Sequence, residues 1–361
     1  MNEKKQLVLI LKNPGTACNI GCIYCAEHRK NYTSVEKIIE LEDIEKLAEL
    51  SKDYLVNVLF HGGEPTLLPI EYYKRIIEIF NKHNEDVFYG LQTNGTLINQ
   101  EWINFISDYN GQVGISISLD GTKEINKNRI TRDNKETFDT VKNNIELLSH
   151  NGIKTGMICT IVSNTLGKEK ELLELLLSFD NLLFVKLNPC FDRNDDGTIP
   201  EWGITPMQYA NFVIRIFDLL LQKGEWGKFN LEPVISVFKN LQNVTSSFCN
   251  YSFEKCSNFV SVYPDGTVTS CDNFNLQQGK LGNLNHLGDV KNIFSFENNQ
   301  YLHAQHEELM TKCQSCDLKE ICKGGCIAAR IRYNDSGEYC DAMKFMCNHM
   351  SGVFKKINEN T

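Results

Sequence analysis

Short apolar runs alternate with amphipathic segments along residues 1–225. The apolar runs are rich in β-branched and aromatic residues and predict strands at 6–11, 54–60, 86–92, 113–119, 153–162 and 182–188. The segments that follow them predict helices at 43–51, 71–82, 99–109, 136–150, 168–178 and 205–223. Such alternation is typical of a parallel sheet with right-handed crossovers. Six units are too few to close an eight-stranded barrel, so the predicted fold is α/β, an open, partial (β/α)6 TIM-like barrel.

The alternation stops after residue 225, where the chain becomes rich in cysteine. Nine of the fourteen cysteines lie between Cys249 and Cys347, and Asn, Gly and Asp become frequent. This composition predicts a small domain over residues 226–361, with a bridging segment and a C-terminal helix, whose minimal core is held together by metal. Residues 1–225 form the other predicted domain.

Composition and charge exclude several functional classes. The 361 residues are 42% hydrophobic and 23% charged, as in an ordinary globular protein, and the net charge of −9 disfavours nucleic acid as a partner. No apolar stretch reads as a signal peptide or a membrane span, so we expect a cytoplasmic protein without a membrane partner. In a reducing compartment, fourteen cysteines indicate metal ligation more than disulfides.

Three cysteines are closely spaced in the loop after the first predicted strand. Cys18, Cys22 and Cys25 follow one another at intervals of four and three. Three thiolates on a cubane leave one iron without a protein ligand, which is how open metal positions arise at catalytic sites. The alternative is a structural zinc site completed by His28.

Polar clusters at the ends of the next three strands favour the catalytic interpretation. They are His61–Thr66, Gln92–Thr96 and Ser118–Gly121. The carboxyl ends of parallel strands share one face, where ligands bind, and glycines there allow backbone groups to approach a ligand closely. A structural zinc would need none of these clusters.

The pattern CxxxCxxC followed by GGEP resembles the radical S-adenosylmethionine (SAM) superfamily. The resemblance implies that a [4Fe–4S] cluster on the three cysteines binds SAM and cleaves it to a 5′-deoxyadenosyl radical, which abstracts hydrogen from a substrate. By position, it implies that the cofactor is bound by Gly62, Gly63, Glu64, Asn94, Ser118 and Arg129. Asn94 is also part of a common turn pair, and Arg129 is alternatively a surface arginine.

The later cysteines resemble a SPASM domain, an extension of radical SAM enzymes that holds auxiliary [4Fe–4S] clusters. The order is Cys256, Gly266, Cys271, Cys313-x2-Cys316-x5-Cys322-x3-Cys326 and Cys340. The resemblance implies one cluster on Cys249, Cys256, Cys271 and Cys326 and a second on Cys313, Cys316, Cys322 and Cys340. Cys347 competes with Cys340, and zinc ribbons are the alternative. The predicted cofactors are therefore three [4Fe–4S] clusters and SAM.

Three further residues are assigned a role here, and two of them have an alternative. Asp272, directly after Cys271, is similar in placement to the aspartate that acts as a base in anaerobic sulfatase-maturing enzymes, and is alternatively a turn cap. Cys159 is expected to be a small buried residue. Cys190 is expected to pack, with a role near substrate as the alternative.

The resemblance extends over nearly the whole chain to sulfatase-maturing enzymes, which oxidise Cys or Ser to formylglycine, and to maturases that cross-link ribosomal peptides. Ala26-Glu27 and His61 depart from the sulfatase-maturing pattern, which tends to have aromatic residues and Gln at these positions. We therefore expect side-chain cross-linking of a ribosomal peptide, as a thioether or carbon–carbon bond, with sulfatase maturation as the alternative. The expected partners are a peptide or protein substrate and a low-potential electron donor of the flavodoxin or ferredoxin type. A non-catalytic electron carrier or metal-storage protein would not require the GGEP segment.

Overall fold

The computed structural model describes residues 4–29, 37–194, 196–246, 248–253, 255–274, 276–286, 288, 292–333 and 336–359. Its contacts divide the chain into two compact units, each built from several segments. The first unit contains residues 1–117, 129–155 and 256–303, and the second contains residues 118–128, 156–255 and 304–361. The predicted domain boundary at residue 225 stays a prediction.

The strands of the first unit form one sheet in the order β10-β9-β8-β1-β2-β3-β4. Their bounds are β1 (Gln6–Lys12), β2 (Leu55–His61), β3 (Val87–Thr93), β4 (Val113–Ser118), β8 (Phe259–Val262), β9 (Thr267–Thr269) and β10 (Lys280–Asn283). Strands β1 to β4 pair in parallel, and β1 also pairs in parallel with β8. Parallel strands covered on both faces are apolar throughout, which is why the run Leu9–Leu11 of β1 is buried without alternation.

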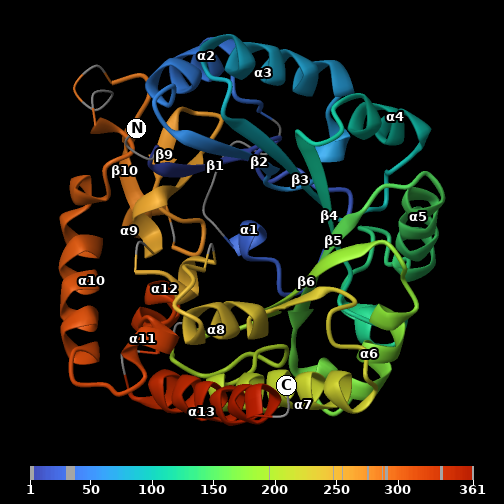
Figure 1. The fold of residues 1–361 in the computed structure, drawn as a ribbon. Helices are drawn as coiled ribbons and strands as arrows, with labels where there is room; N and C mark the ends of the chain where they lie inside the picture. Colours follow the sequence, from blue (N-terminus) through green and yellow to red (C-terminus); the bar gives the residue numbers. More distant parts are fainter. Residues whose placement is uncertain are drawn as a thin grey trace. The chain divides into compact units, whose positions relative to one another are not determined.

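Among the described helices that lie wholly within this unit, the four longer ones each follow one of the parallel strands β1 to β4, and two have only four residues. They are α1 (Ala26–Arg29), α2 (Leu41–Leu50), α3 (Ile70–His83), α4 (Gln100–Asp108), α5 (Phe138–His150) and α9 (Leu276–Gly279). Helices α2 and α3 pack side by side along β1 and β2 (Figure 1). Phe60 of β2 contacts Tyr73 of α3, with ring centroids 4.7 Å apart, and Tyr73 in turn contacts Trp102 of α4. These rings form an aromatic core between sheet and helices.

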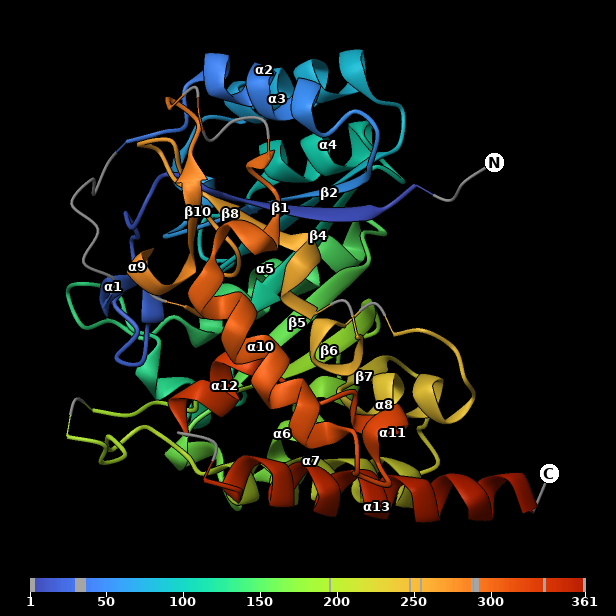
Figure 2. The same ribbon diagram turned by 90° about the vertical axis from the view of Figure 1, so that its left-hand side faces the viewer.

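The second unit contains β5 (Thr155–Ile161) from residue 156 onward, β6 (Leu182–Pro189) and β7 (Asn230–Glu232), with β5 next to β6 and β6 next to β7. Its helices are α6 (Glu169–Leu177), α7 (Pro206–Gln222), α8 (Val234–Leu241), α11 (Lys319–Cys322), α12 (Ile327–Arg332) and α13 (Glu338–Glu359), while α10 (Gln300–Cys313) begins in the first unit and ends in the second. Helix α13 runs beside α7 (Figure 2), and His349 Nε2 lies 2.8 Å from Asp218 Oδ1 between them.

All six predicted strands and all six predicted helices of residues 1–225 are present, with ends that differ by two residues at most. The sequence analysis missed the short strands β7, β8, β9 and β10. Runs of three or four residues are too short to show a period. Among the described residues, no helix is long and apolar enough to span a membrane.

We predict that Phe60→Ala lowers the free energy of unfolding by about 3–5 kcal/mol, because it empties a fully buried site. The matched control is Phe88→Ala on the neighbouring strand β3, where the ring is 48% exposed and the loss should be below about 1 kcal/mol. Anaerobic urea unfolding followed by circular dichroism measures both. Equal losses would contradict the placement of the core.

Candidate functional site

The first three cysteines lie in the loop that connects β1 to α1. All three thiols are half-buried, and the Cys25 amide donates to the Cys22 carbonyl at 3.1 Å. Burial raises the pKa of Cys18, and the nearby Glu64 and Cys25 raise it further. The turn from Cys22 to Cys25 and the close spacing of the three cysteines in one loop fit ligation of one metal centre. The side chain of His28, the fourth ligand in the zinc alternative, lies outside the described part.

The glycines after β2 pack directly against the loop that leads to Cys18. The Gly63 amide donates to the Gly15 carbonyl at 2.9 Å, and the Glu64 amide donates to the Ala17 carbonyl at 2.8 Å. A Cβ atom at Gly63 would lie 1.8 Å from the Ala17 carbonyl oxygen. Only glycine fits there, so one role of the Gly62-Gly63 pair is to bring the end of β2 onto the cysteine loop.

Glu64 joins the ends of β2 and β3. Its buried carboxylate accepts hydrogen bonds from the Asn94 amide at 2.7 Å and from the Thr93 hydroxyl at 2.7 Å, in addition to Thr66. Burial raises the pKa of Glu64, while these hydrogen bonds oppose the rise. The Asn94 side chain in turn lies 3.7 Å from Cys18 Sγ. The structure thus brings Glu64 and Asn94 to the cysteine loop, as the sequence analysis expected of cofactor-binding residues.

Arg129 also lies at the cysteine loop. Its guanidinium is buried and donates to the Tyr24 hydroxyl at 3.0 Å, next to Cys25 in the sequence. The surface interpretation of Arg129 is therefore wrong. Ser118, the last residue of β4, belongs to the second unit, and its role toward the cofactor stays a prediction.

The sequence analysis missed Lys12, the last residue of β1. Its fully buried ammonium donates to Glu27 at 2.9 Å and to Asp272 at 2.7 Å, and it lies 2.9 Å from His61 Nδ1. Burial alone would lower the pKa of Lys12, but the charges of Asp272 and Glu27 outweigh it and raise the pKa above its ordinary value. A lysine at the end of an otherwise apolar strand was the available signal. Because an ammonium only donates, Nδ1 of His61 acts as the acceptor.

Glu27, His61 and Asp272 have the donor set of a metal site, with ligand atoms within 4.8 Å of one another. The Lys12 ammonium contacts all three side chains and supplies a positive charge among them. Three N–H donors match three acceptors. We therefore interpret this group as a lysine-centred cluster, the Lys12 cluster, and assign no metal to it.

The turn between α11 and α12 joins Cys322 to Cys326 and lies beside Cys313. Lys323, Gly324 and Gly325 have φ values of 51°, 84° and 66°, so the chain reverses between Cys322 and Cys326. A Cβ atom at Gly324 would lie 2.8 Å from Met310 Sδ and 3.4 Å from Cys313 Sγ. The glycine pair therefore permits the turn to pack against Cys313.

Cys347 is fully buried on α13 and shares a hydrogen bond with Cys322. That hydrogen bond, together with the charges of Lys255 and Arg330, lowers the pKa of Cys322 to about 7 despite its burial. A low pKa favours the thiolate, which is the form that binds metal. Cys340 is seven residues earlier on α13, about 10.5 Å along the helix. The choice between Cys340 and Cys347 as last ligand stays open.

The other predicted auxiliary ligands divide between the units. Cys249 and Cys326 both belong to the second unit, and burial together with the nearby Cys326 raises the pKa of Cys249 to about 11. Cys256 and Cys271 belong to the first unit. That these four residues hold one cluster stays a prediction.

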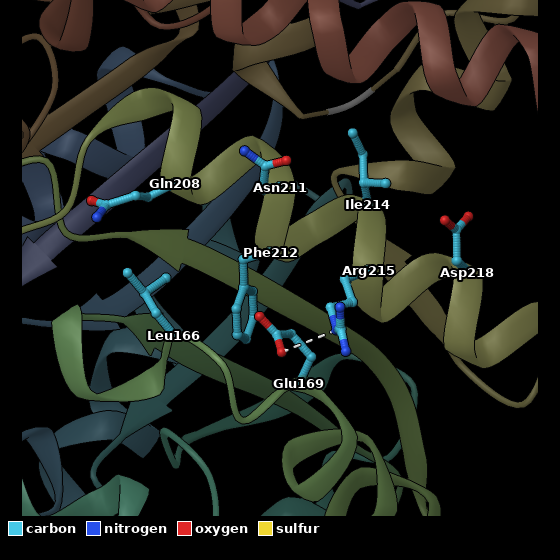
Figure 3. A pocket seen from close by; sticks show the side chains of 8 residues that line it. All are labelled: Leu166, Glu169, Gln208, Asn211, Phe212, Ile214, Arg215 and Asp218. Carbon is cyan, nitrogen blue, oxygen red and sulfur yellow. Dashed lines mark ion pairs between the residues drawn. The ribbon is translucent and has the colours of Figure 1, made fainter.

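The two remaining cysteines, Cys159 and Cys190, are both buried. Cys159 is fully buried in β5, and the Cys190 thiol donates to Asp192 at 3.4 Å. An open pocket of about 490 Å³ is lined by α6 and α7, with Arg215 Nε 3.5 Å from Glu169 Oε2 (Figure 3). Its lining contains none of the predicted site residues, so we assign it no role in the chemistry.

Comparisons with known proteins give two family matches and several relatives that span most of the chain. The radical SAM superfamily matches residues 12–176, and the SPASM iron–sulfur cluster-binding domain matches residues 253–317. The cysteine-type anaerobic sulfatase-maturating enzyme of Clostridium novyi is 29% identical over 89% of this chain and 88% of its own length. The serine-type enzyme of Bacteroides thetaiotaomicron is 26% identical over 98% of this chain and 90% of its own length. The structure of native anSMEcpe with bound AdoMet and the Cp18Cys peptide matches with a TM-score of 0.82 at 25% identity, covering 99% of this chain and 100% of that one.

We predict that Gly63→Ala reduces the iron bound by the N-terminal cysteines, because the added Cβ displaces the backbone at Ala17. Iron per chain and the spectral change on adding SAM measure the loss, while auxiliary iron should remain. Gly114→Ala on β4 is the matched control, since its Cβ would meet no atom within 4 Å. If Gly63→Ala keeps its full iron content and an unchanged spectral response to SAM, then Gly63 is not needed to bring the end of β2 onto the cysteine loop.

Proposed function

Because this chain is a radical SAM enzyme with a SPASM domain, we propose that it oxidises a cysteine or serine of a protein substrate to formylglycine, as anaerobic sulfatase-maturating enzymes do. The family matches confirm the predicted fold class, the oxidoreductase class and the cofactors, SAM and [4Fe–4S] clusters. The observation that carries the proposal is similarity along nearly the whole chain to both cysteine-type and serine-type enzymes.

This proposal reverses the order of the two reactions expected from sequence. The sequence analysis placed peptide cross-linking first, mainly because of His61 and Ala26-Glu27. The relatives reported above favour the alternative, formylglycine formation. A flavodoxin-type or ferredoxin-type electron donor stays a prediction.

When bound, SAM would supply the 5′-deoxyadenosyl radical that abstracts a hydrogen atom from substrate Cβ, and a cluster would accept the one electron then lost. The side-chain proton must leave in the same oxidation. We propose that Asp272 accepts it, because its side chain is 24% exposed and adjoins the predicted ligand Cys271. A serine then becomes the aldehyde directly, whereas a cysteine becomes a thioaldehyde that water converts to the aldehyde with release of hydrogen sulfide.

The Lys12 cluster positions this base. Lys12 Nζ holds Asp272 Oδ2 at 2.7 Å, and the same ammonium is anchored by Glu27, which follows the cysteine loop. A buried ion pair with its donors satisfied fixes side-chain orientation, so the carboxylate presents the same face to each substrate.

The experiment that tests the proposal uses the iron-loaded enzyme, SAM, a reductant and synthetic sulfatase-motif peptides with Cys, Ser or Ala at one position. We expect 5′-deoxyadenosine together with an aldehyde that a hydrazide captures, from the Cys or Ser peptide only. Cys22→Ala is the negative control for SAM cleavage. A peptide product that has lost two hydrogens but does not react with the hydrazide would instead support cross-linking.

We predict that Asp272→Asn still cleaves SAM but forms product roughly 10²–10⁴-fold more slowly, because the amide cannot accept the proton. Liquid chromatography of 5′-deoxyadenosine and mass spectrometry of the peptide separate the two steps. Asp265→Asn, at an exposed turn of the β8–β9 hairpin, is the control and should match the native rate. Unchanged turnover in Asp272→Asn would indicate that Asp272 has a structural role and is not the base.

A further inference from the structure

A buried arginine lies against one of the predicted auxiliary-cluster ligands. Arg330 of α12 is 1% exposed, and its Nη1 lies 3.3 Å from Cys313 Sγ. The same nitrogen donates to the Leu309 carbonyl at 3.1 Å and contacts the Gly324 carbonyl at 3.4 Å. The guanidinium is therefore fixed between the end of α10 and the glycine turn, with one donor directed at a ligand sulfur.

A second buried cation lies near the glycine turn between Cys322 and Cys326. Lys255 is 2% exposed, and its Nζ donates to the Gly325 carbonyl at 2.8 Å. Its charge and that of Arg330 both act on Cys322. Cys322 also shares a hydrogen bond with the Cys347 thiol. Two cations and one further thiol thus face the predicted ligands.

Burying a guanidinium is costly unless nearby negative charge compensates it. The thiolates of a fully ligated [4Fe–4S] cluster supply such charge at this place, so the arginine fits the cluster that the SPASM family implies. Reduction of a cluster adds one more negative charge. A fixed cation and hydrogen bonds to sulfur stabilise the reduced form more than the oxidised form, and therefore raise the reduction potential.

We propose that Arg330 raises the reduction potential of the auxiliary cluster bound by Cys313, Cys316 and Cys322, which makes this cluster a better electron acceptor. Arg330 acts through the ligand sulfur of Cys313 and is not itself a ligand. The inference rests on the proposed function only in assigning the cluster an electron-accepting role. The potential itself is a property of the protein without substrate.

The test is an EPR-monitored redox titration of the full-length, iron-loaded protein. Cys18, Cys22 and Cys25 are replaced by Ala so that only auxiliary clusters contribute to the spectra. We expect Arg330→Met to keep its iron and to shift one auxiliary signal to a more negative potential, with the other signal unchanged. Arg330→Lys, which keeps the charge, should recover part of the shift.

Arg332→Met is the matched control, because Arg332 is on the same helix but donates to the Phe191 carbonyl. The reduction potentials of the auxiliary clusters in Arg332→Met should equal those of the protein in which only Cys18, Cys22 and Cys25 are replaced. An unchanged potential in iron-replete Arg330→Met, or loss of one cluster's iron in both Arg330→Met and a second variant, Arg330→Gln, would overturn the proposal. Formylglycine formation is measured separately with intact Cys18, Cys22 and Cys25, so failure of the proposed function is distinguishable from failure of this inference.

Discussion

The first unit depends on one buried ammonium. Lys12 ends a central strand, and its charge would be costly in this position if its three donors were not all engaged. Its acceptors are Glu27 of α1, His61 at the end of β2 and Asp272 in the segment after β9. The requirement to satisfy one cation therefore holds together the segments that carry the predicted radical chemistry. Neither the cysteine motif nor the GGEP segment alone would fix Asp272.

The second unit uses buried cations in a different way. Lys12 is matched by two carboxylates, whereas Arg330 and Lys255 donate to backbone carbonyls and lie near thiols. With the proposed auxiliary cluster bound, those thiols would be thiolates, and the cations and the iron–sulfur group would compensate each other. Stability of this unit and electron affinity of its cluster are then consequences of the same charges. This coupling explains why a domain rich in loops can have arginine and lysine almost wholly buried.

The sequence predicted what depends on local pattern and failed where distant segments meet. Strands and helices of residues 1–225 follow from apolar periodicity, and the placement of Glu64 and Asn94 near Cys18 follows from strand ends sharing one face. Pairing of β8 with β1 joins residues some 250 apart, and no local period encodes it. The Lys12–Asp272 ion pair spans 260 residues, so only the fold reveals it. Cys340 and Cys347 differ by one heptad on a helix, a separation at which both lie on the same face.

The Lys12 cluster also bears on the departure that had counted against formylglycine formation. His61 stands where sulfatase-maturing enzymes tend to have glutamine, and the sequence alone treats this as a change of chemistry. In the structure, the contact of His61 with Lys12 uses Nδ1 as an acceptor toward an ammonium. The side-chain oxygen of a glutamine accepts in the same way, so either residue satisfies the third donor of Lys12. The substitution therefore preserves the interaction that positions Asp272, and it is compatible with the same reaction.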